Sequence, residues 1–388
     1  MDKICSKKNR TLLMGAAIIA ITICHINQFI GVHKGLQSGL ANEFLYASAA
    51  VGVDIFFFFS LVGLGFSLEN NKLVNFYKHR IKRILPAYLL FMVIVLSLFF
   101  PNSSLNDKWG LFSQQITGVS ATKYVAQRIE WYVPSLILLY ALYPLAFRFV
   151  KWIHRYRTIE LCFLCVTIFS SYIFGLFFVG LFAFRLPLYY LAILSFFYIK
   201  DGNKNQLGII YIIAAAFSFI VKNELLSYAL IIPLFLFVID NYINDLSENK
   251  WAKSISWLGQ YTLEIYLAQV VATKYLIKEL STNNIVIIVW TVILSTIMIS
   301  FILNVFQRLV GNFAGYLSDE IKQSKKGTTR LGWVDAAKGM AMLIIMWGHV
   351  QQPSLLKTWL SSFHVPVFLV LSGLLMARKG SIVCSGGG

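Results

Sequence analysis

Two stretches of the chain decide the fold, Gly15-Ala-Ala-Ile-Ile-Ala-Ile-Thr-Ile-Cys-His25 and Gly339-Met-Ala-Met-Leu-Ile-Ile-Met-Trp-Gly-His349. Each begins at a glycine and reaches a histidine through an almost unbroken apolar run. Such runs are too hydrophobic for helices on the surface of a soluble protein, so we expect them in a lipid bilayer. An ionisable side chain at membrane depth is costly and is a candidate for function. His25 and His349 are therefore the first candidate residues.

The composition of the chain supports the same class. Hydrophobic residues make up 58% and charged residues 13%, whereas soluble domains have about 25% charged residues. Stretches of about 20 apolar residues predict an all-α integral membrane protein, a polytopic bundle of about ten transmembrane helices followed by two C-terminal helices. The predicted spans are centred near Ile19, Phe57, Met92, Leu139, Ile168, Ala192, Ala214, Pro233, Leu267 and Ser295, then Ile344 and Val370.

The net charge of +17 does not indicate a nucleic-acid partner, because the basic residues follow the loops rather than one soluble face. Most of them lie in residues 7–10, 72–83, 148–157, 200–204 and 322–338. The positive-inside rule then predicts a multi-pass protein of the cell membrane with its N-terminus in the cytoplasm. The first span follows Lys3 to Arg10 directly, and no signal-peptide cleavage site is evident after it.

The cysteines do not suggest a disulfide framework or a metal site. The pair Cys162-Phe-Leu-Cys165 has the spacing of metal ligands, but it lies in an apolar helix without polar neighbours. We therefore expect these two side chains to pack in the helix bundle, and we predict no metal.

The chain divides into three segments. Residues 1–310 hold the first ten spans, the polar residues 311–330 form a predicted cytoplasmic linker, and residues 331–388 form a short second unit. The second unit repeats the start of the chain, since Pro366 to Ser372 aligns with Asp54-Ile-Phe-Phe-Phe-Phe-Ser60 as His349 aligns with His25.

Further motifs follow one another in a defined order. They are Gly52-Val-Asp54-Ile-Phe-Phe, Arg80-Ile-Lys-Arg83-Ile-Leu-Pro86, Trp131-Tyr132-Val, Leu139-Tyr-Ala-Leu-Tyr-Pro144, Arg185-Leu-Pro187 and Leu258-Gly-Gln-Tyr-Thr-Leu-Glu264-Ile-Tyr266-Leu. With these motifs and the first-span histidine, residues 11 to 306 resemble the acyltransferase 3 family of membrane acyltransferases. The resemblance implies transfer of an acyl group, usually acetyl, from acyl-CoA to sugars of surface polysaccharides. The second unit resembles the opening of the sugar O-acetylase branch of this family and stops after two spans.

The sequence also departs from the family pattern. Met14 and Thr11 stand where the family usually has a basic residue and an aspartate, whereas the second unit carries both as Lys338 and Asp335. Gln269 stands where a histidine is frequent. These departures leave open a catalytically impaired or truncated member. A further hypothesis is that Lys338 and Asp335 dock against the first unit and supply the charge that Met14 lacks.

The chemistry of acyl transfer suggests roles for the first-unit residues. A base is needed near neutral pH, and histidine is the side chain suited to it, so His25 is the predicted general base; the alternative is a histidine that only holds helices together. Asp54 is the expected partner that orients His25 and sets its tautomer, unless it makes a structural hydrogen bond to a neighbouring helix. Ser60 is a weaker candidate, as the nucleophile of a covalent route.

The resemblance assigns Arg80 and Arg83 to acyl-CoA binding, and guanidinium groups suit phosphate. The alternative is an ordinary positive loop that contacts anionic lipid headgroups. The other candidates are polar or aromatic residues at or near the membrane: Trp131 and Tyr132, as an interfacial aromatic belt or a sugar-stacking pair, and Arg185, Glu264 and Tyr266, with an Arg185–Glu264 ion pair as one option.

We therefore predict a membrane-bound O-acetyltransferase. Its donor, acyl-CoA (most simply acetyl-CoA), is a substrate, and no bound cofactor is expected. The predicted partners are membrane lipid, acyl-CoA and a lipid-linked or surface carbohydrate. The alternative functions are a non-catalytic family member and a protein that moves or tethers glycan intermediates. A secondary transporter is disfavoured, because such folds have inverted repeats and the repeat here is parallel.

Overall fold

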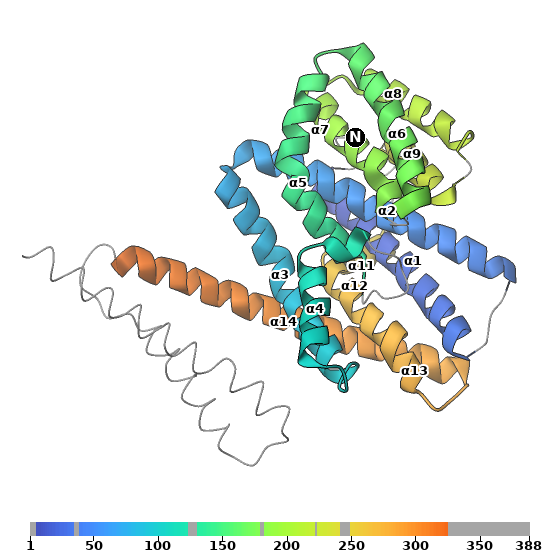
Figure 1. Ribbon diagram of the computed structural model, residues 1–388, viewed down its shortest axis with the longest axis vertical. Coiled ribbons are helices and arrows are strands. Elements are labelled where there is room, and N and C mark those ends of the chain that lie inside the picture. The colour runs from blue at the N-terminus through green and yellow to red at the C-terminus, as the bar shows by residue number, and fades with distance from the viewer. Residues whose placement is uncertain are drawn as a thin grey trace, which may run out of the picture. The chain divides into compact units, whose positions relative to one another are not determined.

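The computed structural model describes residues 5–34, 39–122, 130–178, 182–221, 223–240 and 249–324. These residues form helices and connecting turns and contain no strand (Figure 1). The helices are α1 Lys7–Lys34, α2 Gly39–Asn70, α3 Leu73–Leu98, α4 Leu105–Ile116, η1 Val119–Thr122, α5 Tyr132–Ile153, α6 Arg157–Phe178, η3 Ala183–Arg185, α7 Leu186–Lys200, α8 Lys204–Ser218, α9 Glu224–Ile239, α11 Lys250–Leu258, α12 Thr262–Val271, η4 Ala272–Leu276, α13 Ile277–Glu279 and α14 Ile285–Ser324. The all-α prediction is confirmed.

Within the described residues, six helices are long and apolar enough to cross a membrane. They are Lys7–Val32, Asn42–Asn70, Leu73–Leu98, Tyr132–Ile153, Arg157–Gly175 and Ile285–Phe313. The other four predicted centres lie in α7, α8, α9 and α12, which have 10 to 16 residues each. At 1.5 Å per residue, a helix of 15 residues reaches about 23 Å, less than the hydrocarbon core of about 30 Å. The count of ten full spans is therefore not confirmed.

The chain forms two compact units, Met1–Arg308 and Leu309–Gly388. In the second unit the structure describes Leu309–Ser324, the end of α14, so this helix continues into the polar segment that we predicted as a linker. Asp335, Lys338 and His349 lie outside the described residues, and the predictions for them remain predictions.

The core of the first unit is built around α2. This helix packs against α1, α7 and α9, and α8 packs against α9 (Figure 1). The four consecutive phenylalanines 56–59 are at most 3% exposed, and the Tyr143 hydroxyl of α5 donates to the Leu61 carbonyl at 2.8 Å. Because α2 is enclosed by protein on several sides, its polar residues Asp54 and Ser60 lie inside the bundle rather than toward lipid.

Two glycines bring α1 and α11 into backbone contact. A Cβ atom at Gly15 would lie 1.9 Å from the carbonyl oxygen of Ile255, and one at Gly259 would lie 1.8 Å from that of Thr11. Only glycine, which has no Cβ, allows so close an approach. The Thr11 and Ser256 hydroxyls share a hydrogen bond of 2.5 Å at the same crossing. This contact fixes the first turns of α1 beside residues 259–262.

The helix after α11 is irregular. α12 ends at Val271, five residues of π-helix follow from Ala272 to Leu276, and α13 ends the segment at Glu279. The Thr273 hydroxyl donates to the Gln269 carbonyl at 2.6 Å where the α-helical turn gives way. π-helical turns occur frequently at functional sites, and this one begins three residues after Gln269.

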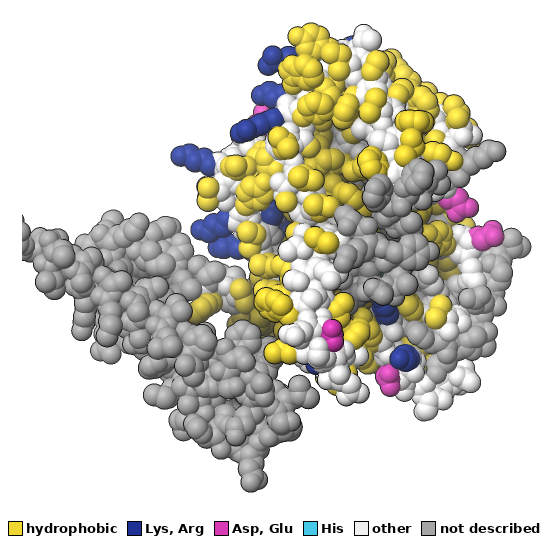
Figure 2. Space-filling view, in the orientation of Figure 1, with side chains coloured by type: hydrophobic (Ala, Val, Ile, Leu, Met, Phe, Trp, Pro, Cys, Tyr) yellow, Lys and Arg dark blue, Asp and Glu magenta, His cyan; other side chains and the backbone are white. Residues whose placement is uncertain are grey.

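The surface is largely apolar, as a membrane protein requires. Figure 2 shows hydrophobic side chains over much of the upper part of one face, and several Lys and Arg side chains along its left edge. Cys162 and Cys165 of α6 are exposed and free. The expectation that they pack inside the bundle is wrong, because α6 turns these two positions outward.

Candidate functional site

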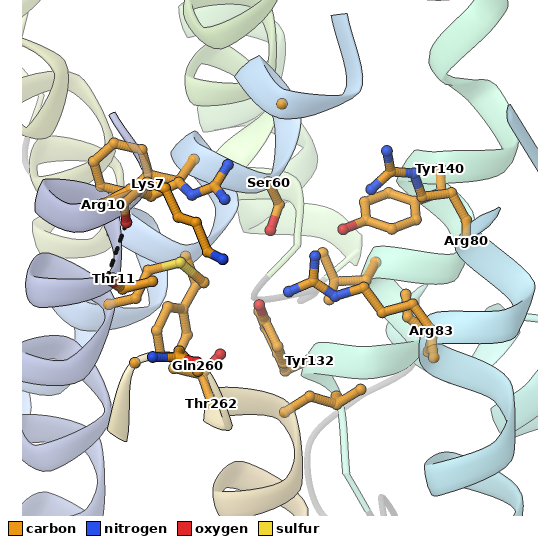
Figure 3. Close-up of a pocket in the computed structure, with 18 residues that line it drawn as sticks. Lys7, Arg10, Thr11, Ser60, Arg80, Arg83, Tyr132, Tyr140, Gln260 and Thr262 are labelled. Carbon is orange, nitrogen blue, oxygen red and sulfur yellow. Dashed lines mark hydrogen bonds between the residues drawn. The ribbon is translucent and has the colours of Figure 1, made fainter. Parts of the chain in front are cut away.

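A cavity of about 410 Å³ opens among α1, α2, α3, α5 and the segment from Gly259 to Leu263 (Figure 3). Its lining contains four basic side chains, Lys7, Arg10, Arg80 and Arg83, and none of the described residues that line it is acidic. Ser60, Tyr132, Tyr140, Gln260 and Thr262 add hydroxyl and amide groups to the wall. Helices distant in sequence thus place four positive charges around one space.

The four basic residues have no acidic partner in the part of the chain that the structure describes. None of them forms an ion pair with a described residue, and Nε of Arg80 is buried without a hydrogen-bond partner there. Arg10, Arg80 and Arg83 are close enough to repel one another. Like charges held together in a partly enclosed space raise the local positive potential and favour an anionic ligand. The cavity is therefore suited to a ligand with several negative charges.

Sequence reasoning found Arg80 and Arg83 but counted Lys7 and Arg10 only as positive-inside charges. A signal was present, because Lys7, Arg10, Thr11 and Met14 have the spacing i, i+3, i+4 and i+7 that places side chains on one helical face. All four line the cavity. Met14, the departure from the family pattern, therefore stands on the same wall as Arg10, one turn further along α1.

His25 lies deeper along α1, about 22 Å from Arg10 at the helical rise of 1.5 Å per residue. It is half-buried, and its Nδ1 is 2.8 Å from Oε1 of Gln269, which is fully buried in α12. The imidazole ring also contacts the rings of Phe29 and Tyr266, at centroid distances of 6.1 and 6.5 Å. The residue that the sequence marked as a departure, Gln269, is thus the hydrogen-bond partner of the candidate base.

Aromatic rings connect the cavity with His25. Tyr132 lines the cavity, its ring contacts that of Tyr266 at 5.0 Å, and Tyr266 in turn contacts His25. Tyr132 is only 5% exposed, so the interpretation of this residue as part of a lipid-facing aromatic belt is wrong. The tyrosine side chains extend the wall of the cavity toward the imidazole.

Glu130, which sequence reasoning did not select, holds this aromatic pair in place. It is 4% exposed, and its carboxylate accepts hydrogen bonds from the backbone N–H groups of Tyr132 and Val133 at the start of α5. It also accepts one from the Tyr266 hydroxyl at 3.0 Å. A carboxylate at a helix N-terminus is a favourable cap. The sequence did contain a signal for this cap, since Glu130-Trp-Tyr stands directly before the apolar run of α5.

Asp54 does not contact His25. Its Oδ1 accepts a hydrogen bond of 2.7 Å from Nε of Arg185, and both side chains are at most 3% exposed. The Arg185 guanidinium lies 4.9 Å from the ring centroid of Trp131. The prediction that Asp54 orients His25 is therefore wrong, because the buried arginine takes its carboxylate.

The remaining candidates fall in separate places. Ser60 lines the basic part of the cavity, where the described wall holds no histidine or carboxylate to activate it. Glu264 is 6% exposed and does not line the cavity. The optional Arg185–Glu264 ion pair is absent from the described residues, since Arg185 pairs with Asp54. No group of three metal-ligating side chains occurs in the part of the chain that the structure describes.

Comparison with known proteins gives one match. The model of the acyltransferase 3 family, described as an acyltransferase domain, matches residues 12–305 and 331–384. No curated protein and no solved structure matches the chain. The matched residues include His25, Tyr132, Tyr266 and the cavity residues from Met14 onward, whereas Lys7, Arg10 and Thr11 precede the match. The match indicates an acyltransferase of the membrane. The chain belongs to the acyltransferase 3 family.

Proposed function

We propose that this protein transfers an acyl group, most simply acetyl, from acyl-CoA to hydroxyl groups of a cell-surface carbohydrate. The observation that carries the proposal is the cavity with four basic residues, whose aromatic wall leads to a histidine. Family membership supports the acyltransferase chemistry in general. The choice of donor and acceptor rests on the charge and position of the groups described above.

The donor is inferred from charge. Acyl-CoA carries several phosphate charges at one end and an acyl thioester at the other, joined by a long flexible arm. The four cations of the cavity suit the phosphates, since guanidinium groups bind phosphate oxygens in pairs and remain charged. The distance of about 22 Å along α1 from Arg10 to His25 suits a molecule whose charged end and reactive end are far apart.

Arg10 also bears on the alternative of an impaired member. That hypothesis rests on Met14, where the family usually has a basic residue. In the structure Arg10 lies one helical turn earlier and lines the same cavity as Met14. We propose that Arg10 supplies the positive charge that Met14 does not, so the departure does not remove a phosphate-binding group from this wall.

The proposed reaction is a direct transfer. Nε2 of His25 accepts the proton of the acceptor hydroxyl while the hydroxyl oxygen attacks the thioester carbonyl carbon. The carbon–sulfur bond then breaks, and the departing CoA sulfur takes up the proton from the imidazolium. The products are an ester and CoA with a free thiol. The surroundings of Ser60 favour this route over a covalent one, because a serine nucleophile needs an adjacent base.

The acceptor is proposed from the position of the base. His25 lies well inside a membrane-spanning helix, so the hydroxyl must reach membrane depth. A lipid-linked sugar or a growing surface glycan is held at the bilayer and meets this condition. The product class is therefore an O-acylated, most simply O-acetylated, glycan at the cell membrane.

The test uses cells that lack the gene and are complemented with the intact chain, His25→Ala, Arg83→Ala or Arg10→Ala, each checked for membrane expression. Mass spectrometry of the surface glycans measures O-acetyl groups. We expect the intact chain to restore them, His25→Ala to abolish them, and both arginine variants to reduce them. Lys82→Ala is the matched control, because Lys82 is exposed beside Arg83 and does not line the cavity.

A second assay separates the donor from the acceptor. Purified protein is mixed with acetyl-CoA in detergent micelles, and isothermal titration measures donor binding. Arg83→Ala and Arg10→Ala should weaken binding about tenfold or more, whereas His25→Ala should leave it nearly unchanged. Equal binding by the intact chain and both arginine variants would refute the assignment of the cavity. No acyl change with any version, despite donor binding, would favour a non-catalytic member or another acceptor.

A further inference from the structure

The sequence suggests Asp54 as the partner of His25, but in the structure the hydrogen-bond partner of His25 is Gln269. Gln269 is 0% exposed, and its Oε1 lies 2.8 Å from His25 Nδ1. Its backbone is held at the junction of α12 with the π-helical turn, where the Thr273 hydroxyl donates to the Gln269 carbonyl at 2.6 Å. A side chain buried on such a backbone has few alternative positions, so it can hold the imidazole in one orientation.

Two carboxylates that could have oriented the imidazole accept hydrogen bonds from other groups. Asp54 accepts from Arg185, and Glu130 accepts from the start of α5 and from the Tyr266 hydroxyl. Tyr266 contacts His25 by its ring, not by its hydroxyl. Among the described residues, the side-chain hydrogen bond of His25 is therefore the one to Gln269, a neutral amide.

An amide carbonyl can only accept a hydrogen bond. If Oε1 faces the imidazole, Nδ1 must carry the proton, and Nε2 is left with its lone pair. That tautomer is the one a general base needs at Nε2. A neutral partner also avoids placing an ion pair at membrane depth, where charged groups are costly.

We propose that Gln269 is a positioning residue that holds His25 in the tautomer with the proton on Nδ1 and the lone pair on Nε2. The catalytic consequence rests on the proposed acyl transfer, whereas the tautomer itself does not. The opposite amide orientation would turn Nε2 of Gln269 toward His25 and require the other tautomer. In the structure Nε2 of Gln269 has no hydrogen-bond partner among the described residues, and the tautomer of His25 distinguishes the two orientations.

The first experiment measures the tautomer without any substrate. The full chain is labelled with ¹⁵N-histidine, and the imidazole nitrogens are recorded by NMR in lipid nanodiscs. The signal of His25 among the six histidines is assigned by its loss in His25→Gln. We expect a protonated Nδ1 in the intact protein and in Gln269→Glu, which keeps acceptor oxygens at this position. Gln269→Met, of similar length and without a hydrogen bond, should give a mixture of tautomers.

The second experiment measures kinetics with acetyl-CoA and a glycan acceptor. Gln269→Met should lower kcat about tenfold or more at nearly unchanged KM for acetyl-CoA. Gln269→Glu should keep most of the activity and move the acid limb of the pH–rate profile to higher pH, since a nearby negative charge favours the imidazolium. The matched control is Gln115→Met, because Gln115 is also a buried glutamine (2% exposed) whose Oε1 accepts from Tyr88; its kcat should be unchanged.

The results separate the two proposals. A protonated Nε2 in the intact protein, or an unchanged tautomer in Gln269→Met, would overturn the role of Gln269. A kcat of Gln269→Met equal to that of Gln115→Met would overturn its catalytic consequence. If the intact protein does not turn over acetyl-CoA, the proposed function fails, and the NMR result still decides whether Gln269 sets the tautomer.

Discussion

The ion pair between Asp54 and Arg185 makes a quantitative prediction about stability. Nε of Arg185 donates to Oδ1 of Asp54 at 2.7 Å, and the side chains are 3% and 0% exposed. In Asp54→Asn the guanidinium stays buried and charged, because arginine does not lose its proton in proteins. Breaking a buried pair in this way costs about 3–5 kcal/mol in the free energy of unfolding.

Substitution of the other member of the pair, Arg185, should lower the free energy of unfolding by less. In Arg185→Met the remaining carboxyl group can take up a proton and become neutral, so the penalty of a buried charge is avoided. The double variant with Asp54→Asn and Arg185→Met removes both charges, and replacing a buried pair by neutral groups is often nearly neutral for stability. We therefore expect the intact protein to be the most stable and Asp54→Asn the least stable, with Arg185→Met and the double variant between them.

The assay is thermal unfolding of the full chain in detergent micelles, followed by tryptophan fluorescence. A change of 1 kcal/mol shifts Tm by about 2 °C in a protein of this size, so Asp54→Asn should lower Tm by about 6–10 °C. The double variant should recover at least half of that loss. If Asp54→Asn unfolds at the temperature of the intact protein, or if adding Arg185→Met recovers nothing, the reasoning from a buried and coupled ion pair is refuted.

Three other predictions concern packing, pH and salt. Gly259→Ala would place a Cβ atom 1.8 Å from a carbonyl oxygen of α1 and should destabilise the protein by about 1–3 kcal/mol in the same unfolding assay, whereas Gly110→Ala, with open space around it, should not. A hydrogen bond to Glu160, with a second one to Asp201, raises the pKa of His154 above its ordinary value. The stabilisation that protonated His154 contributes is complete below pH about 6.5 and is lost as the pH rises through the raised pKa. Tm should therefore fall over that pH range, and His154→Gln should make this fall smaller. Added salt should weaken acetyl-CoA binding, and less steeply in Arg83→Ala than in the intact protein; equal slopes would contradict an electrostatic role for the cavity.

Several features of the fold were predictable because their causes are local. A helix satisfies its own backbone hydrogen bonds, so a long apolar run in a membrane protein implies a helix wherever it occurs. All ten predicted centres from Ile19 to Ser295 fall in helices of the described chain. The lengths of the helices were less predictable, because the residues of α7 and α12 are mostly buried in protein and these helices need not match the thickness of the bilayer.

The candidate site was predictable only in part. His25, Arg80 and Arg83 were identified because the sequence resembles a family with residues at those positions. Arg10 and Gln269 were not assigned to the site, although both were visible in the sequence, because their roles depend on what lies opposite them. Gln269 contacts a residue 244 positions away in sequence.

The sequence by itself determined the class of the protein, its helices and its family, since these follow from composition, from the periodicity of single segments and from ordered motifs. Only the tertiary structure decided the pairings. In it Asp54 pairs with Arg185, Gln269 is hydrogen-bonded to His25, and Glu130 is hydrogen-bonded to Tyr266. The physical reason is that a buried polar group must find a partner inside the protein, and which partner is within reach depends on how distant helices pack, not on the residues beside it in the chain.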